Sequence, residues 1–162
     1  MQKFFLALLL TLLFVGCSQT KPHLPQQQKQ QQKQKPYKNV ITKNLFEEYK
    51  KWEGVAYKFG GASMNGIDCS ALVQRLYRDA LGIKIPRSTK EQIKLGKYVA
   101  RNRLREGDII FFKTGYKSMH SGIYLQRGNF INASSTHGVT LSNLNNPYWR
   151  AHYFQSRRVL HY

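Results

Sequence analysis

The clearest pattern of apolar positions predicts a helix that begins at residue 69. Asp68 is suited to cap its N-terminus, and Gly82 is suited to end it. A shorter apolar pattern over 45–52 predicts another helix before it. In the main helix the apolar residues recur three and four positions apart, which is the spacing of a helix with one face on a core: Cys69, Leu72, Val73, Leu76 and Ala80.

The pattern changes to a period of two in the second half of the chain. Before that change, Ser88 and Glu91 have the spacing of a capping box and predict the start of a further helix. Helices followed by alternating strands predict an α+β domain with a mainly antiparallel sheet. Strands are expected in the segments that alternate and are separated by Gly, Asn and Pro, namely 108–112, 120–126, 129–133, 139–142 and 157–160.

The N-terminus has the pattern of an export signal. Lys3 precedes an apolar run over residues 4–15 that is shorter than the roughly 20 residues a membrane-spanning helix needs. The run ends at Gly16-Cys17-Ser18, which resembles a bacterial lipobox, whose cysteine is lipidated and becomes the new N-terminus. We therefore expect a signal peptide over 1–16 and a lipid anchor at Cys17; an ordinary signal with a coincidental cysteine is the alternative. Ser18 favours anchoring in the outer membrane, facing the periplasm.

Composition separates a tether from a folded domain. Residues 17–44 are rich in Gln and Lys and have little to bury, which predicts a flexible spacer, with a protein-binding arm as the alternative. Residues 45–162 are long enough for one domain with its own core. The chain carries 26 Lys and Arg against 8 Asp and Glu. This balance favours an anionic environment such as the cell wall or a membrane surface, and export argues against nucleic acid as the partner.

Cys69 is the candidate nucleophile. If Cys17 carries a lipid, the chain has no second cysteine to pair with Cys69 in an oxidising compartment. The first turn of a helix stabilises a thiolate, because its free N–H groups and dipole favour negative charge. An isolated cysteine can also be a small buried apolar residue, and position alone leaves both interpretations open.

His120 and Asn132 are candidates to complete a catalytic set. Alternation places His120, Gly122 and Tyr124 on one strand face, and the other face is expected to pack on the core. His120 is then expected to point toward the helix that carries Cys69. A three-residue loop over 126–128 would place Asn132 opposite Gly122 and on the face of His120, whereas a two-residue loop would turn it away. His137 is the rival for orienting His120.

Six motifs occur in the order of one family. Together they resemble the NlpC family of cell-wall cysteine peptidases, and within it the Spr-type murein endopeptidase lipoproteins. The resemblance implies a papain-like α+β fold and hydrolysis of peptide bonds that involve diaminopimelate and D-amino acids. The motifs are Tyr57-Lys58-Phe59-Gly60-Gly61, Gly66-Ile67-Asp68-Cys69-Ser70, Pro86-Arg87-Ser88-Thr89, Gly107-Asp108, His120-Ser121-Gly122-Ile123-Tyr124 and Phe130-Ile131-Asn132-Ala133-Ser134.

The resemblance also implies roles for single residues. Cys69 would be the nucleophile, His120 the base and Asn132 the group that orients His120, with the Tyr57 hydroxyl and the Cys69 N–H stabilising the oxyanion. Two positions depart from the usual pattern: Asn132 stands where His is usual, and Ala71 where Gly is common. The groove residues that would bind substrate are Asp68, Ser70, Arg87 and Ser88, two of which also suit helix caps.

Other classes of function remain as alternatives. A catalytically silent wall-binding lipoprotein would not require both Cys69 and His120, and a thiol acyltransferase on the same fold should have a more apolar cleft. A metallopeptidase is disfavoured, since no His-Glu helical pair or paired cysteines provide zinc-ligand spacing. We expect no cofactor and no metal.

Overall fold

The computed structural model describes residues 40–116 and 118–161. The predicted signal peptide, Cys17 and most of the predicted tether lie outside these residues. Within them the predicted α+β class is confirmed: helices come first and an antiparallel sheet follows. No helix in the described ranges is both long and apolar enough to cross a bilayer.

A six-stranded antiparallel sheet forms the frame of the domain, in the order β3-β8-β4-β5-β6-β7. A separate small hairpin, β1 (Ala62–Ser63) and β2 (Gly66–Ile67), precedes it. The six strands are β3 (Lys97–Val99), β4 (Ile109–Gly115), β5 (Ser118–Tyr124), β6 (Asn129–Ser134), β7 (Gly138–Asn143) and β8 (Tyr153–Arg158).

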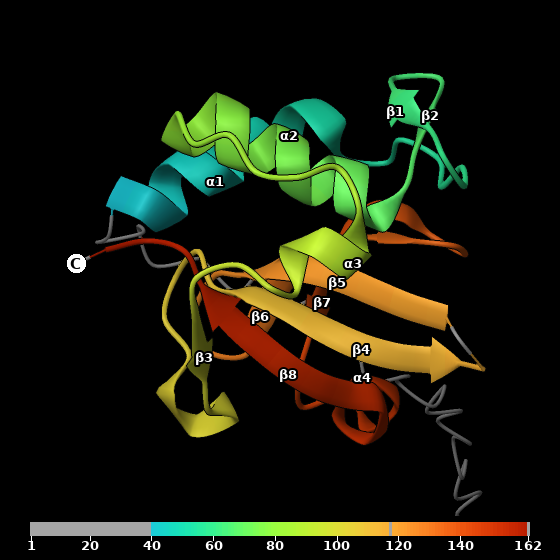
Figure 1. Ribbon diagram of the computed structural model, residues 1–162. Coiled ribbons are helices and arrows are strands. Elements are labelled where there is room, and N and C mark those ends of the chain that lie inside the picture. The colour runs from blue at the N-terminus through green and yellow to red at the C-terminus, as the bar shows by residue number, and fades with distance from the viewer. Residues whose placement is uncertain (1–39, 117, 162) are drawn as a thin grey trace, which may run out of the picture. The chain divides into compact units, whose positions relative to one another are not determined.

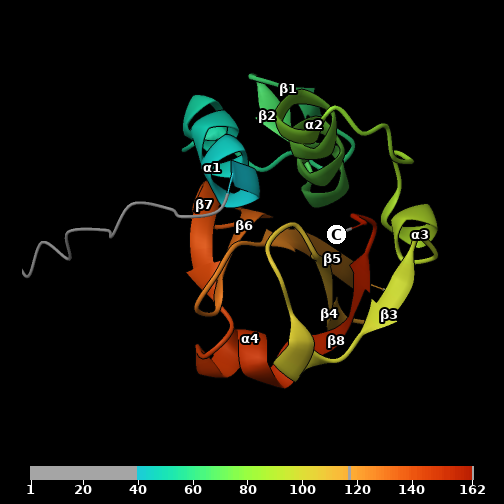
Figure 2. The same cartoon turned by 90° about the vertical axis from the view of Figure 1, so that its left-hand side faces the viewer.

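Helices lie on both faces of this sheet. Figure 1 shows α1 (Val40–Trp52) and α2 (Cys69–Leu81) together on one face, and Figure 2 shows α4 (Pro147–His152) on the opposite face. A one-turn helix, α3 (Thr89–Gln92), and a 3₁₀ helix (Arg101–Arg103) lie between α2 and β4 in the chain. The two helical layers therefore cover different sets of sheet residues.

Alternation along the strands divides the core into two clusters. Phe111 and Ile123 pack in the cluster that contains Leu72 and Leu76 of α2. The neighbours Ile110 and Phe112 face the other way and pack with Phe130, and Trp149 of α4 lies against them. Each buried Leu, Ile or Phe stabilises the fold by about 1.5–3 kcal/mol, so both clusters are needed to hold α2 and α4 on the sheet.

The predicted helix caps are confirmed. The Asp68 carboxylate accepts a hydrogen bond from the Ala71 N–H at 2.7 Å, and Gly82 ends α2 with a left-handed φ of 69°. Ser88 caps α3 by accepting from the Glu91 N–H at 3.3 Å. Local chemistry therefore fixes where α2 begins, and with it the position of Cys69 as its first residue.

Two boundaries differ by four or more residues from the sequence prediction, and some elements were not predicted. Helix α1 begins at Val40 rather than residue 45, inside the predicted tether, because Thr42 is buried and Ile41 packs on the core. Strand β8 begins at Tyr153 rather than 157, since pairing with β4 and β3 overrides its polar composition. The helix α4 was not predicted.

A buried ion pair fastens the end of β8 to the turn before β4. Asp108 is fully buried, and Arg158 donates to its two carboxylate oxygens from Nε and Nη2, each at 2.8 Å. The Arg105 N–H donates to the same carboxylate at 2.8 Å. Both oxygens of the Asp108 carboxylate therefore accept hydrogen bonds from protein groups. The pair is also distant from Cys69 in the sequence.

Strands β5 and β6 are paired over only part of their length. They pair from Tyr124 opposite Phe130 to Gly122 opposite Asn132, and the pairing ends at Gly122. On the far side of Gly122, β5 continues along β4 to Ser118, and β6 continues along β7 to Ser134. The sheet thus opens between β5 and β6 just where His120 lies.

Candidate active site

Cys69 lies at the N-terminus of α2 and is 6% exposed. Burial raises the pKa of its thiol. The hydrogen bond and charge of His120, together with the Ser121 backbone N–H and hydroxyl, lower this pKa by more than burial raises it. The net pKa lies below the ordinary value of a cysteine, in the direction that the helix N-terminus also favours. Cys69 therefore has the electrostatic environment of a nucleophile and not of an inert core thiol.

His120 is held by an amide whose orientation is determined by its partners. Asn132 is fully buried, and its Nδ2 donates to the Ser142 Oγ at 2.9 Å and to the Thr140 carbonyl at 3.4 Å. Because a carbonyl only accepts, the nitrogen must face Thr140, and the Asn132 Oδ1 must face His120, whose Nε2 is 3.2 Å away. His120 therefore carries its proton on Nε2, which leaves Nδ1 as the basic nitrogen available to Cys69.

The predicted register of Asn132 is confirmed. The Leu125 N–H bonds to the Asn129 carbonyl at 2.9 Å across a three-residue loop, in which Arg127 and Gly128 have positive φ. Asn132 consequently lies opposite Gly122, on the face of His120. A side chain at position 122 would meet the Ile131 carbonyl at 2.6 Å, so Gly122 permits this close pairing and does not leave open space for substrate.

The prediction that the His120 face of the strand points toward the helix of Cys69 was wrong. The α2 helix packs on the face of Ile123, while His120 lies on the opposite face, against Phe112 and Trp149. His120 meets Cys69 at the opening between β5 and β6 and not across a flat sheet face. Alternation predicted the two faces correctly, but it could not show that the sheet divides at Gly122.

Trp149 is a site residue that the sequence analysis missed. Its ring stacks on His120 with centroids 5.4 Å apart and an angle of 24° between planes, and it also contacts Phe112 at 4.7 Å. Trp149 belongs to α4, which Asn146 caps and Pro147 begins. The Asn-Pro pair ahead of an aromatic residue was the signal that could have revealed this helix.

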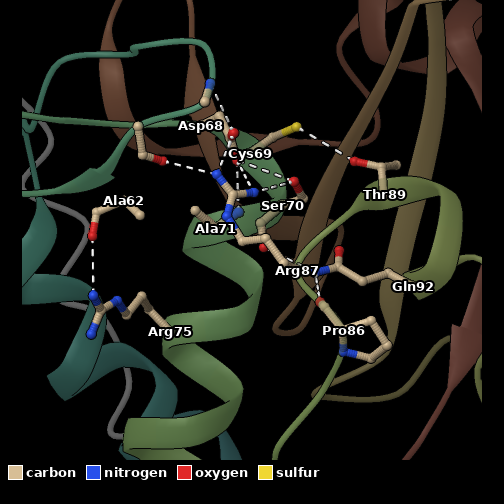
Figure 3. A network of polar contacts seen from close by, with 12 residues as sticks. Ala62, Asp68, Cys69, Ser70, Ala71, Arg75, Pro86, Arg87, Thr89 and Gln92 are labelled. Atoms are coloured by element: carbon tan, nitrogen blue, oxygen red, sulfur yellow. Dashed lines mark hydrogen bonds and ion pairs between the residues drawn. The ribbon is translucent and has the colours of Figure 1, made fainter.

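A charged network adjoins the nucleophile, and Figure 3 shows it around Asp68. Arg87 donates to both Asp68 oxygens, at 2.9 and 2.6 Å, and also to Ser70 Oγ at 2.9 Å and the Gly61 carbonyl at 3.2 Å. Burial raises the pKa of Asp68, but Arg87, the Ala71 N–H and Ser70 lower it below the ordinary value. Asp68, Ser70 and Arg87 are thus brought together beside Cys69, as predicted.

The predicted oxyanion residue Tyr57 borders the same site. Its backbone forms an isolated bridge with Ile67, two residues before Cys69, and its side chain is among those that line the adjoining cleft. Burial raises the pKa of the Tyr57 hydroxyl, and the negative charges of Cys69 and Asp68 raise it further. The hydroxyl therefore stays protonated and able to donate.

Two candidates are engaged elsewhere. Ser88 donates to the Glu91 carboxylate at 2.6 Å, so its hydroxyl closes the capping box on the surface. His137 is exposed in the β6–β7 turn, where its Nδ1 lies 2.8 Å from the Thr136 hydroxyl, and Asn132 rather than His137 contacts His120. Thr89, which was not predicted, lies nearer the chemistry, with its hydroxyl 4.0 Å from the Cys69 sulfur (Figure 3).

A cleft of about 830 Å³ occupies the opening between β5 and β6. Met119 and His120 line one wall, and Ala133 and Ser134 line the other. Its described lining carries hydroxyl, amide, imidazole, aromatic and aliphatic groups but no Asp, Glu, Lys or Arg. In residues 40–116 and 118–161 no three His, Cys, Asp or Glu side chains gather closely enough to hold a metal ion. The cleft thus presents the His120 imidazole, while Cys69 lies buried beside it.

Comparisons with known proteins agree with this geometry. The model of the NlpC/P60 family matches residues 54–158. Escherichia coli K12 murein DD-endopeptidase MepS/murein LD-carboxypeptidase is 44% identical over 76% of this chain, and the match spans 66% of that protein, just under two thirds of its length. A second protein of the same strain, named probable endopeptidase NlpC, is 35% identical over 97% of this chain and 99% of its own length.

Solved structures show the same fold. A Staphylococcus aureus protein described as similar to lipoprotein, NLP/P60 family, is 33% identical with a TM-score of 0.68, over 76% of this chain and 43% of that one. The Mycobacterium tuberculosis peptidoglycan hydrolase RipB is 28% identical with a TM-score of 0.63, over 75% of this chain and 66% of that one. The family model, the fold and the arrangement around Cys69 lead to the same conclusion: this chain belongs to the NlpC/P60 family.

Proposed function

We propose that the protein is a peptidoglycan endopeptidase that hydrolyses cross-link or stem-peptide bonds involving diaminopimelate and D-amino acids. The observation that carries the proposal is the Cys69–His120–Asn132 arrangement, in which Asn132 fixes the protonated nitrogen of His120 and the thiol pKa of Cys69 is lowered. The names of the relatives support the substrate class, since they describe murein endopeptidases and a peptidoglycan hydrolase.

In the proposed reaction, the Cys69 thiolate attacks the scissile carbonyl and forms a C–S bond. The imidazolium of His120 gives its Nδ1 proton to the leaving amine as the C–N bond breaks. Water then attacks the thioester, His120 accepts the proton from water, and the thiolate leaves. The Cys69 N–H and the Tyr57 hydroxyl stabilise the oxyanion in both steps, which requires Tyr57 to be protonated, as its raised pKa ensures.

This chemistry assigns a direction to the substrate. The amine that leaves must be within reach of His120, so the half of the substrate that it belongs to occupies the neutral cleft between β5 and β6. The acyl half then lies toward Asp68, Ser70 and Arg87. A cleft of this size on the amine side suits an enzyme that cuts inside a branched polymer, where a large group remains on each side of the bond.

The two alternative classes receive less support. The thiol acyltransferase should bind a long apolar chain, yet most of the described residues that line the cleft carry a hydroxyl or amide group. A silent binding module has no need for a thiol of lowered pKa beside an oriented imidazole.

We propose further that the chain is anchored by a lipid at Cys17 in the outer membrane, facing the periplasm. Support comes from the Gly16-Cys17-Ser18 sequence after the apolar run. The Gln- and Lys-rich residues that follow would span the distance from membrane to wall. Growth with labelled palmitate should label the wild type and not Cys17→Ala, and label retained by the variant would contradict the anchor.

The activity is tested with purified sacculi and the full-length chain in mild detergent, by mass spectrometry of the released muropeptides. We expect cross-linked dimers to become intact monomers if a cross-link is cut, and stems to become shorter if the stem bond is cut. Cys69→Ala should release neither product. Cys17→Ala is the matched control, because it replaces the other cysteine and should digest detergent-dispersed sacculi like the wild type. Digestion by Cys69→Ala would contradict the assignment of the nucleophile.

A further inference from the structure

The Ser121 hydroxyl is a buried polar group without a hydrogen-bond partner among the described residues. Ser121 is fully buried in β5, and its Oγ is one of the few buried side-chain polar atoms in the described residues without such a partner. A hydroxyl left in this state costs free energy, so it requires an explanation. Its position beside His120 in the chain suggests one.

The Ser121 side chain lies on the sheet face that carries α2. Alternation places Ser121 on the same face as Ile123, which packs with Leu72 of that helix. Both α2 and α3 pack on β5. The first residue of α2 is Cys69, whose side chain is also buried. The hydroxyl and the sulfur therefore approach the same contact between helix and strand.

The Ser121 backbone N–H is directed to the same place. The Tyr124 N–H bonds to the Asp108 carbonyl on the β4 side. Because N–H groups alternate in direction along a strand, the N–H of Ser121 points to the β6 side. There the pairing of β5 with β6 has already ended at Gly122, so the strand ladder offers it no partner.

We propose that Ser121 is a catalytic residue that donates two hydrogen bonds to the Cys69 thiolate, one from its hydroxyl and one from its backbone N–H. Hydrogen bonds to an ionised acceptor are stronger than neutral ones, so the donors gain most when the sulfur is charged. The hydroxyl that is unsatisfied beside a neutral thiol finds its acceptor when the thiolate forms. This inference rests on the proposed role of Cys69 as the nucleophile.

Other groups around the sulfur must be held constant in the test. His120 approaches from β5, Tyr57 from the segment before β1, and Asp68 precedes Cys69 and is paired with Arg87. The competing hydroxyl is that of Thr89 on α3, 4.0 Å from the sulfur. Replacement of Ser121 or of Thr89 leaves all the titratable groups in place.

The experiment measures the rate of Cys69 alkylation by iodoacetamide against pH, with the full-length chain in mild detergent. Peptide mass spectrometry confirms that the adduct is on Cys69. For Ser121→Ala we expect the midpoint of the thiolate profile to rise by about one pH unit, which is a tenfold change in the ionisation equilibrium. For Thr89→Val we expect a much smaller rise. An unchanged midpoint in Ser121→Ala, or a larger rise in Thr89→Val, would overturn the proposal.

Thermal unfolding separates this role from a structural one. Removal of a hydroxyl that lacks a partner should leave the melting temperature of Ser121→Ala unchanged or higher. The matched control is Ser156→Ala, a fully buried β8 hydroxyl that bonds to the Val99 carbonyl and Tyr153, each at 2.7 Å. It should melt several degrees lower with its alkylation profile unchanged. A lower melting temperature for Ser121→Ala with no change in alkylation would also overturn the proposal. Neither readout uses wall substrate, so failure here is distinct from failure of the peptidase assignment.

Discussion

Two arginine–aspartate pairs, each with two hydrogen bonds to its carboxylate, serve different purposes in this domain. Arg158 and Arg87 each donate to both oxygens of a buried aspartate. The Arg158 side chain is 20% exposed and that of Asp108 not at all, whereas the Arg87 side chain is 38% exposed and that of Asp68 11%. Each arginine also donates outside its pair, Arg158 to the Arg103 carbonyl and Arg87 to Ser70 and Gly61. The comparison teaches that burial and position, rather than the number of hydrogen bonds to the carboxylate, distinguish a structural pair from one at an active site.

The largest effect should come from breaking the inner pair. Arg158→Met leaves the Asp108 charge buried without its partner, which we expect to lower the free energy of unfolding by about 3–5 kcal/mol in denaturant titration. Activity per folded molecule should stay near the wild-type value, because the pair is remote from Cys69. Arg157→Met, at a neighbouring arginine with no ion pair among the described residues, is the control. Equal losses of unfolding free energy in Arg158→Met and Arg157→Met would show that the ion pair with Asp108 has no special structural role.

The outer pair should show the opposite balance. Arg87→Met removes a partner from Asp68 beside the nucleophile, and we expect kcat/KM on sacculi to fall roughly 10- to 100-fold, equivalent to about 1.4–2.7 kcal/mol. The free energy of unfolding should fall by about 1 kcal/mol or less, since the pair is partly exposed to solvent. If Arg87→Met lost stability but kept its activity, the assignment of this pair to the active site would be wrong.

Acid should weaken the outer pair in a defined pH range. The folded pKa of Asp68 lies below its ordinary value of 3.8, so the stability it contributes is present above that value and is lost as pH falls below it. In Arg87→Met the folded pKa moves back toward 3.8. The gap in unfolding free energy between wild type and variant, about 1 kcal/mol at pH 6, should therefore close as pH falls below 3.8. A gap that is constant from pH 6 to 2.5 would show that Asp68 does not titrate with the pair.

The smallest effect is expected next to Arg87. Ser88→Ala should cost about 0.5–1 kcal/mol of stability, as the loss of an N-cap does, and leave kcat/KM within about twofold of wild type. Glu91→Gln, which keeps an acceptor for the Ser88 hydroxyl, should lose less. A tenfold drop in kcat/KM for Ser88→Ala at unchanged stability would instead make Ser88 a substrate-binding residue.

The sequence predicted what is decided locally. The start of α2 follows from the Asp68 cap, and the register of Asn132 follows from the length of the loop before Asn129. In both cases the hydrogen bonds that fix the position connect residues only a few positions apart. This is why the placement of Cys69 and the pairing of His120 with Asn132 could be inferred before the structure.

The sequence could not predict what depends on distant contacts. Helix α4 is too short to be stable by itself and relies on Trp149 packing against β4 and β6. The pairing of Arg158 with Asp108 joins residues that lie 50 positions apart, and no local pattern reports it. The approach of His120 to Cys69 depends on where β5 and β6 separate, which alternation does not encode.

The order of the site along the chain has a consequence for biosynthesis. Cys69 precedes β5, which supplies His120 and Ser121, so a growing chain carries the nucleophile before it carries the groups that ionise it. Until β5 docks against α2, Cys69 lacks the His120 and Ser121 groups that lower its thiol pKa. The latent state needs no inhibitory segment, because completion of the sheet is itself the step that activates the nucleophile. A chain that stops short of β5 should accordingly react with iodoacetamide as slowly as a free cysteine peptide does at neutral pH.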